Sequence, residues 1–120
     1  IVLPEIDPVL PITLAPGGVA YLRQNLGLTG LLMTDDISMG ALDGPVAERG
    51  RRALQAGCDI VLHCNGDFNE METIAAQSGL LTGAATKRAD IALGARRTPI
   101  DIDISDLEAE FETLMRTAKT

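Results

Sequence analysis

The stretch GLLMTDD, at residues 30–36, is a continuous apolar run that ends abruptly in two carboxylates. Because its apolar residues do not alternate with polar ones, residues 30–34 are typical of a strand buried on both faces. A second run, DIVLH at residues 59–63, has the same character. Between them, residues 46–57 repeat apolar positions at helical spacing and end at Gly57, which predicts an amphipathic helix with a glycine C-cap. Two buried strands joined by a helix form a βαβ unit, so we predict an α/β fold with a parallel sheet.

The rest of the chain is predicted to surround this unit with loops and helices. Residues 1–18 contain four prolines, which excludes a helix or a central strand there. In the last helix Ser105 is the expected N-cap, with Glu108 at the capping-box position. The other helices are predicted over residues 19–26, 70–77 and 83–97, and an extended link over residues 98–104. The apolar positions of the last helix form a stripe that we expect to be buried: Leu107, Phe111, Leu114, Met115 and Ala118.

Composition and charge argue against several classes of partner. The 120 residues suit one domain, and 46% hydrophobic with 22% charged residues is an ordinary globular composition. The formal net charge of −7 argues against nucleic acid, because phosphate binding needs clustered Lys and Arg. The nearest basic cluster, Arg49, Arg51 and Arg52, is expected to be a solvated helix face. Apolar runs fall far below the ~20 residues that a membrane-spanning helix needs, so no membrane partner is predicted.

The two cysteines, Cys58 and Cys64, flank the second apolar run. In an extended strand they would lie about 20 Å apart at roughly 3.3 Å per residue, which is too far for a disulfide. We therefore expect buried free thiols, which suit a reducing compartment. Together with the lack of a recognisable signal peptide, this predicts a cytoplasmic protein.

Chemistry in parallel α/β folds lies at the C-terminal ends of the strands, and here two such positions carry reactive side chains. Asp35 and Asp36 follow the first run, where a carboxylate pair forms either a cap or Asx-turn or part of an active site, and position alone favours neither. His63, the single histidine, ends the second run, where a structural role is more common than a catalytic one. His63, Cys64 and Asp67 match no zinc-ligand spacing, so no metal site is predicted.

The run LGLTGLLMTDDISMGAL, residues 26–42, resembles the signature of glycoside hydrolase family 3, and more narrowly that of the bacterial β-N-acetylhexosaminidases of cell-wall recycling. The family pattern there is Leu-Gly-Phe-x-Gly, a hydrophobic strand, then Ser/Thr-Asp-Asp-Leu-Ser-Met. Flanking segments agree in order and spacing, so the resemblance covers residues 1–67 well and the rest more loosely. These segments are IDP at residues 6–8, PITL at 11–14, AER at 47–49, AGCD at 56–59 and CN at 64–65.

This resemblance implies the C-terminal part of a (β/α)8 TIM barrel, with parallel strands and flanking helices. Residues 29–34 would be its seventh strand, residues 59–64 its eighth, and residues 1–3 the end of its sixth. Residues 1–98 would then belong to the barrel, through its eighth helix, and residues 99–120 to a C-terminal extension with the terminal helix. Because a barrel of this kind needs about 250 residues, we expect this chain to be a fragment.

By resemblance, Asp35 is the nucleophile of a retaining glycosidase, which forms a covalent glycosyl-enzyme without a metal or other cofactor. Asp36 would support it and Met39 would line the sugar site, although loop packing explains Met39 equally well. The implied substrate is a small carbohydrate with terminal N-acetylglucosamine, a β-linked muropeptide or chito-oligosaccharide. The family's proton donor is a histidine in a Lys-His-Phe-Pro-Gly-His-Gly motif with a downstream Asp-Ser-His, and neither stretch occurs here. His63 does not match it, so the chain alone is expected to be inactive and poorly stable.

Two other functions stay open. A phosphotransfer module using Asp35 and Asp36 also places an acidic pair at a strand end, but it needs a further Asp on the next strand and a later Lys to hold magnesium and phosphoryl oxygens. Here the second strand ends in His63, and Lys87 falls in the middle of a predicted helix. A non-catalytic remnant or interaction module of barrel origin would keep the fold and lack the activity.

Overall fold

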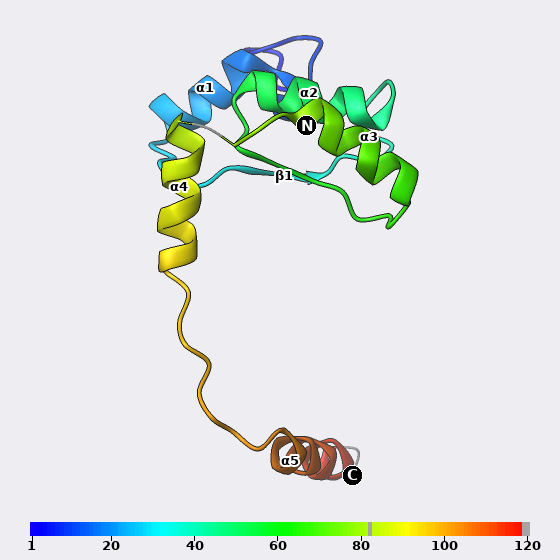
Figure 1. The fold of residues 1–120 in the computed structure, drawn as a ribbon, viewed down its shortest axis with the longest axis vertical. Helices are drawn as coiled ribbons and strands as arrows, with labels where there is room; N and C mark the ends of the chain where they lie inside the picture. Colours follow the sequence, from blue (N-terminus) through cyan, green and yellow to red (C-terminus); the bar gives the residue numbers. More distant parts are fainter. Residues whose placement is uncertain (82, 119–120) are drawn as a thin grey trace.

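Two short parallel strands organise the structure, and helices cover one of their faces (Figure 1). The computed structural model describes residues 1–81 and 83–118. In these residues β1 (Met33–Asp36) pairs with β2 (Ile60–Leu62), with Met33 opposite Ile60 and Asp36 opposite Leu62, so the register shifts by one residue between Met33 and Asp36. The other elements are η1 (Ile12–Leu14), α1 (Pro16–Gln24), α2 (Val46–Ala56), α3 (Phe68–Ser78), α4 (Gly83–Gly94) and α5 (Ile104–Thr117). The predicted α/β fold, with two parallel strands joined by a helix, is confirmed.

α2 is the central helix of the covering layer, where it contacts α1, α3 and β2. It approaches the sheet closely at Gly50, where an added Cβ would lie 3.3 Å from both the Cδ1 atom of Ile37 and the Cγ1 atom of Val61. A glycine permits this approach without displacing either side chain. The helix ends at the predicted C-cap, because Gly57 adopts the left-handed conformation with φ of 112°.

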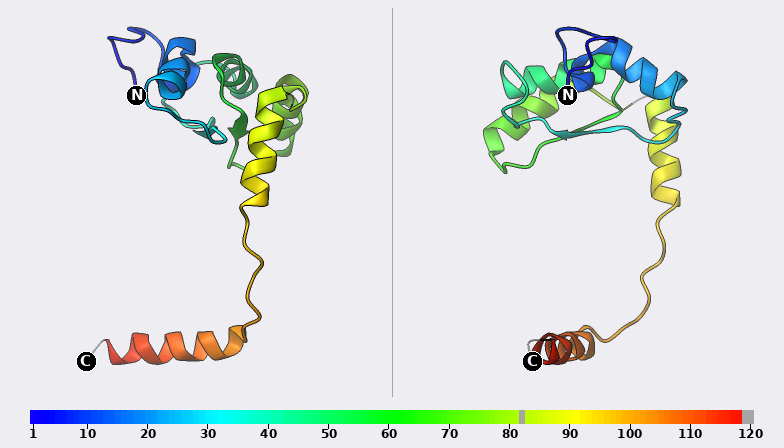
Figure 2. Two further views of the ribbon diagram at one scale, coloured as in Figure 1. Left: turned by 90° about the vertical axis from the view of Figure 1, so that its left-hand side faces the viewer. Right: turned by 180° about the vertical axis from the view of Figure 1, so that it is seen from behind.

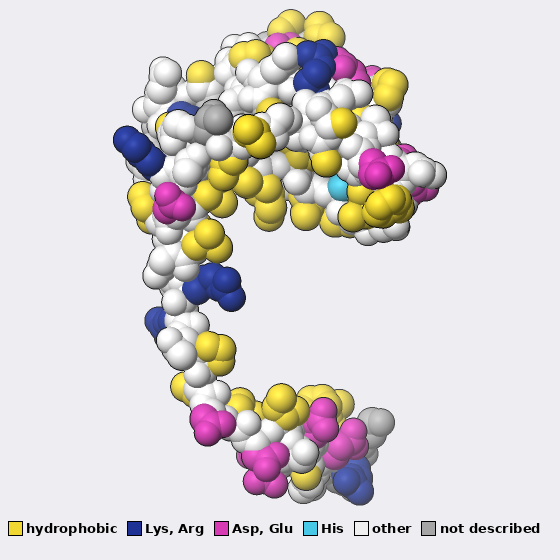
Figure 3. Space-filling view, viewed as in Figure 1, with side chains coloured by type: hydrophobic (Ala, Val, Ile, Leu, Met, Phe, Trp, Pro, Cys, Tyr) yellow, Lys and Arg dark blue, Asp and Glu magenta, His cyan; other side chains and the backbone are white. Residues whose placement is uncertain are grey.

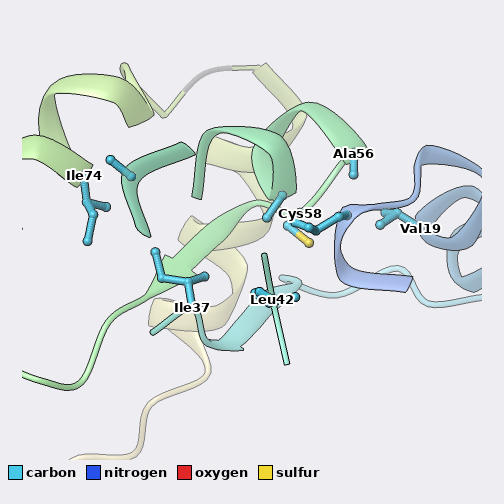
Figure 4. Packing of buried hydrophobic residues seen from close by; sticks show 9 residues of the cluster. Val19, Ile37, Leu42, Ala56, Cys58 and Ile74 are labelled. Atoms are coloured by element: carbon cyan, nitrogen blue, oxygen red, sulfur yellow. The ribbon is translucent and has the colours of Figure 1, made fainter. Parts of the chain in front are cut away.

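A small aliphatic core lies between the helices and the sheet (Figure 4). Ile37, the residue directly after β1, has the largest fully buried side chain among the described residues. The buried residues clustered around it are Leu14, Val19, Leu42, Ala47, Ala53, Ala56, Cys58 and Ile74. Several of these side chains are small, so the core buries little apolar surface, and polar contacts must contribute to holding the strands together.

The burial of β1 differs from the predicted strand with two buried faces. Met33 is 52% exposed, Thr34 is buried and Asp35 is exposed, which is the alternation of a sheet covered on one side. The helices lie on the side of Thr34, and the opposite face of the strands is uncovered (Figures 1 and 2). The strand also begins at Met33 instead of residue 30, and it includes both aspartates. The run has apolar side chains on both faces of the strand. The described helices cover only one of these faces.

The C-terminal part of the chain stands away from the body (Figure 2). α4 leads into an extended segment over residues 95–103, and α5 lies beyond it, remote from the strands. The N-cap of α5 is Asp103 and not Ser105, because the Asp103 carboxylate accepts the N–H groups of Ser105 and Asp106. The predicted burial of the apolar stripe is wrong, since its members are all exposed: Leu107, Phe111, Leu114, Met115 and Ala118. The amphipathic pattern is present in α5, but no described segment covers it.

The N-terminal segment is a loop, as its prolines predict, apart from η1 and one antiparallel bridge between Val2 and Pro11. Residues 1–3 therefore do not pair with β1 or β2, in contrast to the expected end of a barrel strand. α1 begins at Pro16, whose fixed φ suits the first helical position, and ends at Gln24, earlier than predicted.

The two cysteines are both free thiols, but only Cys58 is buried. Cys64 is exposed because it follows β2 and leaves the core, so the prediction of two buried thiols is half right. Within the described residues, no helix has both the length and the apolar character needed to cross a membrane.

The carboxylate of Asp59 joins four segments at the N-terminal ends of the strands. Its side chain is 2% exposed, and it accepts hydrogen bonds from Arg23 of α1 at 2.7 Å and from Arg88 of α4 at 2.5 and 2.8 Å. The Leu32 N–H, just before β1, donates to it at 2.9 Å. Burial raises the pKa of Asp59, but the hydrogen bonds from Arg88, Leu32 and Arg23 outweigh it and lower the pKa to about 2.

We expect Asp59→Asn to lower the free energy of unfolding by about 2 kcal/mol at neutral pH, because hydrogen bonds to a charged group contribute roughly 1.5–3 kcal/mol. The folded-state pKa of Asp59 lies below its ordinary value of 3.8. Its contribution is therefore complete above about pH 4 and is lost as the pH falls from there towards 2. Urea unfolding of the two proteins, at neutral pH and near pH 2, measures the difference.

The exposed Asp101, in the extended segment, supplies the matched control. Asp101→Asn should leave both the unfolding midpoint and its pH dependence unchanged. If Asp59→Asn costs the same stability near pH 2 as at neutral pH, the ionised carboxylate is not what joins these segments.

Candidate active site

The C-terminal ends of the two strands meet at one edge of the sheet, as their parallel arrangement requires. Asp35 and Asp36 end β1, and residues 63–65 follow β2. A backbone hydrogen bond of 3.0 Å, from the Ile37 N–H to the Leu62 carbonyl, joins the two strand ends. The structure thus brings together the two positions that the sequence indicated as candidate sites.

Asp36 links the two strand ends through its carboxylate. Its Oδ1 atom accepts the N–H of Ser38 at 3.1 Å and the N–H of Cys64 at 3.2 Å, while Oδ2 accepts the Ser38 hydroxyl. The Ser38 hydroxyl oxygen also lies 3.0 Å from Oδ1 of Asn65. The Ser38 hydroxyl and N–H lower the pKa of Asp36, burial opposes them, and the Cys64 N–H and His63 add to the lowering. Asp36 is therefore an ionised group that holds the strand ends in place.

Asp35 lies on the uncovered face of the sheet. Its side chain is exposed, and its Oδ1 atom accepts the N–H of Asp36 at 2.8 Å. Met33 and Asp35 are exposed and Thr34 between them is buried, so Asp35 shares the exposed face with Met33, and the register of β1 against β2 shifts between Met33 and Asp36. The sequence left open whether the acidic pair forms an Asx-turn or part of an active site, and the two aspartates differ in this respect. Asp36 forms the Asx-turn with Ser38, and Asp35 presents a carboxylate that a ligand on the open face could reach.

Arg49 of α2 fixes the loop that follows the acidic pair. Its Nη1 atom donates to the carbonyls of Ile37 at 3.0 Å and Met39 at 3.1 Å, and its Nε atom donates to the carbonyl of Gly44 at 2.8 Å. Ile37 is fully buried, so the loop is held by the core at one point and by the guanidinium at three. Met39 is about half exposed on this loop. Its predicted contact with a sugar stays a prediction.

Sequence reasoning missed Arg49, which was expected on a solvated helix face. Arg51 behaves as that expectation says, in a surface ion pair with Glu48. Arg49 is not solvated in this way, because the loop before α2 passes across its side of the helix. The path of that loop could not be predicted, since a loop has no periodic sequence pattern.

His63 is on the covered side of the sheet. Its side chain is 7% exposed, and its Nε2 atom lies 2.9 Å from Oε2 of Glu70 on α3. Its Nδ1 atom is buried without a hydrogen-bond partner in the described part of the chain. This placement favours the structural role that the sequence predicted. In the same residues, no group of three His, Cys, Asp or Glu side chains is arranged to hold a metal ion.

A helix-covered parallel sheet with an exposed carboxylate where a strand ends is an α/β arrangement, and its candidate site lies at the carboxyl edge of the sheet. Comparison with known families narrows this class. Residues 1–94 match the family model described as the glycosyl hydrolase family 3 N terminal domain. The chain therefore belongs to glycosyl hydrolase family 3, and this membership favours the glycosidase interpretation over the phosphotransfer alternative.

Curated relatives agree with this family. The chain is 41% identical over 68 residues to a β-hexosaminidase of Alkalilimnicola ehrlichii, a match that covers 54% of this chain and 19% of the relative. It is 50% identical over 46 residues to a β-hexosaminidase of Methylobacillus flagellatus, covering 37% of this chain and 13% of the relative. A β-hexosaminidase of Vibrio cholerae is 49% identical over 47 residues, covering 37% and 14%. The resemblance to β-N-acetylhexosaminidases is confirmed, over less than a fifth of each relative's length.

Asp35 and Asp36 accept hydrogen bonds from different backbone N–H groups, so we expect their removal to have different effects. Asp36→Ala removes the acceptor of the Ser38 and Cys64 N–H groups, so these two amides should exchange with deuterium at least about tenfold faster. Asp35→Ala, one residue away, should leave both exchange rates unchanged, because Asp35 accepts the N–H of Asp36 instead. Residue-resolved amide exchange in the purified chain measures both. Equal acceleration in the two variants would contradict the assignment of Asp36 as the link.

Proposed function

We propose that this chain supplies the catalytic nucleophile, Asp35, of a retaining β-N-acetylhexosaminidase. The observation that carries this proposal is the exposure of Asp35 on the uncovered face at the end of β1, next to a carboxylate that is committed to structural hydrogen bonds. Membership of glycosyl hydrolase family 3 and similarity to β-hexosaminidases support the reaction class.

The reaction proceeds in two displacements. A carboxylate oxygen of Asp35 forms a bond to the anomeric carbon as the bond from that carbon to the leaving oxygen breaks, and an acid outside these residues protonates the leaving oxygen. Water then attacks the anomeric carbon of the glycosyl-enzyme, its proton passes to the same group, and the Asp35 carboxylate is released. Two inversions give net retention of configuration.

The surrounding residues act by holding Asp35 still and by their charge. The Asp36 hydrogen bonds to Ser38 and Cys64 fix the end of the strand that carries the nucleophile. A small displacement of a reacting group from its productive position lowers the reaction rate strongly. The fixed position of this strand end therefore contributes to the rate of the glycosyl transfer. The negative charge of Asp36 also favours the positive charge that develops on the sugar ring in the transition state. Met39, on the loop fixed by Arg49, is proposed to line the sugar site.

The remaining parts of the site must come from other strands. Two strands do not close a sheet, and the chain matches less than a fifth of the length of its relatives. We infer that residues 1–98 form the C-terminal part of a (β/α)8 barrel and residues 99–120 an extension, which the structure describes as far as residue 118. The acid/base group and the side chains that grip the sugar would lie on the earlier strands. The proposed substrate is terminal N-acetylglucosamine on a β-linked muropeptide or chito-oligosaccharide.

We expect Asp35→Ala, made in the full-length protein that carries this chain, to lower kcat for a chromogenic N-acetyl-β-glucosaminide by at least about a thousandfold, since it removes the nucleophile. The purified 120-residue chain should show no hydrolysis. Asp43→Ala, in the loop beyond Met39, is the matched control and should retain near wild-type kcat.

Two results would overturn the proposal. One is near wild-type activity in Asp35→Ala. The other is a folded full-length protein that binds N-acetylglucosamine but does not hydrolyse the substrate, which would identify the non-catalytic interaction module that the sequence left open.

A further inference from the structure

We propose that Asn65 binds the sugar directly: its side-chain oxygen accepts a hydrogen bond from an O–H or N–H group of N-acetylglucosamine, while Ser38 holds its side-chain nitrogen. This inference rests on the proposed function, because it adds a substrate contact to the same site. The experiment that tests it measures binding of the sugar and not hydrolysis, so the two proposals can fail separately.

Asn65 lies at the carboxyl edge of the sheet, in the segment that follows β2. The N–H of Cys64, just before it, donates to Oδ1 of Asp36 at 3.2 Å. The backbone that leads into Asn65 is therefore joined to the residue next to the proposed nucleophile. The chain bends at Asn65, and Gly66 follows with φ of 73°, a conformation that residues with side chains rarely adopt. Asn65 is thus placed beside the end of β1 by the contacts and conformations of its neighbours.

The hydroxyl of Ser38 determines which way the Asn65 amide points. A hydroxyl has one proton, and the Ser38 hydroxyl donates its proton to the carboxylate of Asp36. A hydrogen bond to an ionised acceptor is stronger than one to a neutral acceptor, and the hydroxyl and N–H of Ser38 hold the pKa of Asp36 below its ordinary value. The proton of Ser38 is therefore committed to Asp36, and the Ser38 oxygen is left as an acceptor.

The Asn65 amide must then offer a donor to Ser38. The Ser38 oxygen lies 3.0 Å from this amide, at the position of Oδ1, where two acceptors would face each other without a proton between them. A half-turn of the amide exchanges Oδ1 and Nδ2, so that Nδ2 donates to Ser38 and Oδ1 faces away from it. Asn65 thereby presents a hydrogen-bond acceptor at the carboxyl edge of the sheet.

Asn65 differs from an ordinary surface asparagine because it is exposed and yet held in place. Its backbone is joined to Asp36 through the preceding N–H, and its side chain is joined to Ser38. An exposed side chain that rotates freely must be ordered when a ligand binds, and this ordering weakens binding. Here the fold has already ordered the amide, which is the preorganisation that a binding group needs.

The adjoining surface has the composition of a ligand site. Figure 3 shows hydrophobic side chains gathered on the side of the body that faces α5, and the uncovered face of the strands lies on that side in Figure 1. Ligand sites combine apolar surface with a few well-placed polar groups. Asp35 and Asn65 are two such groups at neighbouring strand ends, one to react with the anomeric carbon and the other to accept a hydrogen bond from the same sugar.

The test measures binding of N-acetylglucosamine to the full-length protein that carries this chain and to its Asn65→Ala variant, by titration calorimetry. We expect the variant to raise Kd at least about tenfold, because a donor of the sugar loses its partner. The titrations are repeated with analogues that each lack one hydroxyl group and with one that lacks the acetamido group. On one of these analogues Asn65→Ala should have no further effect, since the contact is already missing, and that analogue identifies the donor.

Asn69→Ala is the matched control, because Asn69 is the next asparagine of the chain and is also exposed, on α3. It should change Kd less than twofold. An unchanged Kd in Asn65→Ala would overturn the proposal. An equal loss on every analogue would also overturn it, because Asn65 would then act on the shape of the site and not on the sugar.

The orientation of the amide is tested in the chain labelled with ¹⁵N. One Nδ2 proton of Asn65 should exchange with water several times more slowly than the other, and Ser38→Ala should remove this difference because it removes the acceptor. Solvent saturation transfer measures both rates, and the signals are assigned by their absence from Asn65→Ala. Equal exchange of the two protons in the unaltered chain would overturn the assignment of Oδ1 as the group that faces the sugar.

These outcomes are separable from those of the proposed function. Binding that Asn65→Ala weakens, in a protein that does not hydrolyse substrate, would contradict the proposed catalysis and leave this contact standing. Binding and hydrolysis that Asn65→Ala leaves unchanged would overturn this contact alone. A full-length protein that does not bind N-acetylglucosamine would overturn both.

Discussion

The carboxylate of Asp59 holds together four segments that the short strand ladder alone would not fix. β1 has four residues and β2 has three, so the strands form few backbone hydrogen bonds with each other. The hydrophobic core that packs against them is also small. Asp59 compensates at the N-terminal ends, where two arginines and a backbone N–H converge on one buried group. Removing one partner from such a cluster leaves a buried charge without its partner, and this destabilises the folded state. Through the Leu32 N–H, this carboxylate joins the start of β1 to the start of β2.

Asp36 joins the two strands at their C-terminal ends, as Asp59 does at their N-terminal ends. Asp36 joins the end of β1 to the segment after β2 through backbone N–H groups and a hydroxyl, all of which favour its ionised form. Its carboxylate is therefore committed to hydrogen bonds within the protein, whereas the side chain of Asp35 is exposed. The proposed nucleophile is thus presented by a structural neighbour, on an element fixed at both ends.

The elements that the sequence predicted best are those with local signals. The apolar runs and the glycine at residue 57 located the strands and the helix between them, because periodicity and capping act over a few residues. The contacts of Asp59 could not be predicted, since its partners Arg23 and Arg88 lie 36 and 29 residues away. Position indicated the acidic pair, but which aspartate faces outward depends on the strand register, which the sequence does not reveal.

The clearest failures of prediction share one physical cause. Both the apolar run of β1 and the stripe of α5 were expected to be buried, and both have a face that no described segment covers. Burial depends on what lies opposite an element, and amphipathic patterning reports only that a partner is needed.

A covalent glycosyl-enzyme on Asp35 would show directly that this carboxylate is the nucleophile. Full-length protein that is turning over a slowly hydrolysed N-acetylglucosaminide would be quenched in acid, digested and analysed by mass spectrometry. We expect the peptide containing Asp35 to gain the mass of one N-acetylhexosamine residue, in an ester linkage that fragmentation places on that side chain. The same modification on a different residue, or its absence while the glycosyl-enzyme demonstrably accumulates, would contradict it.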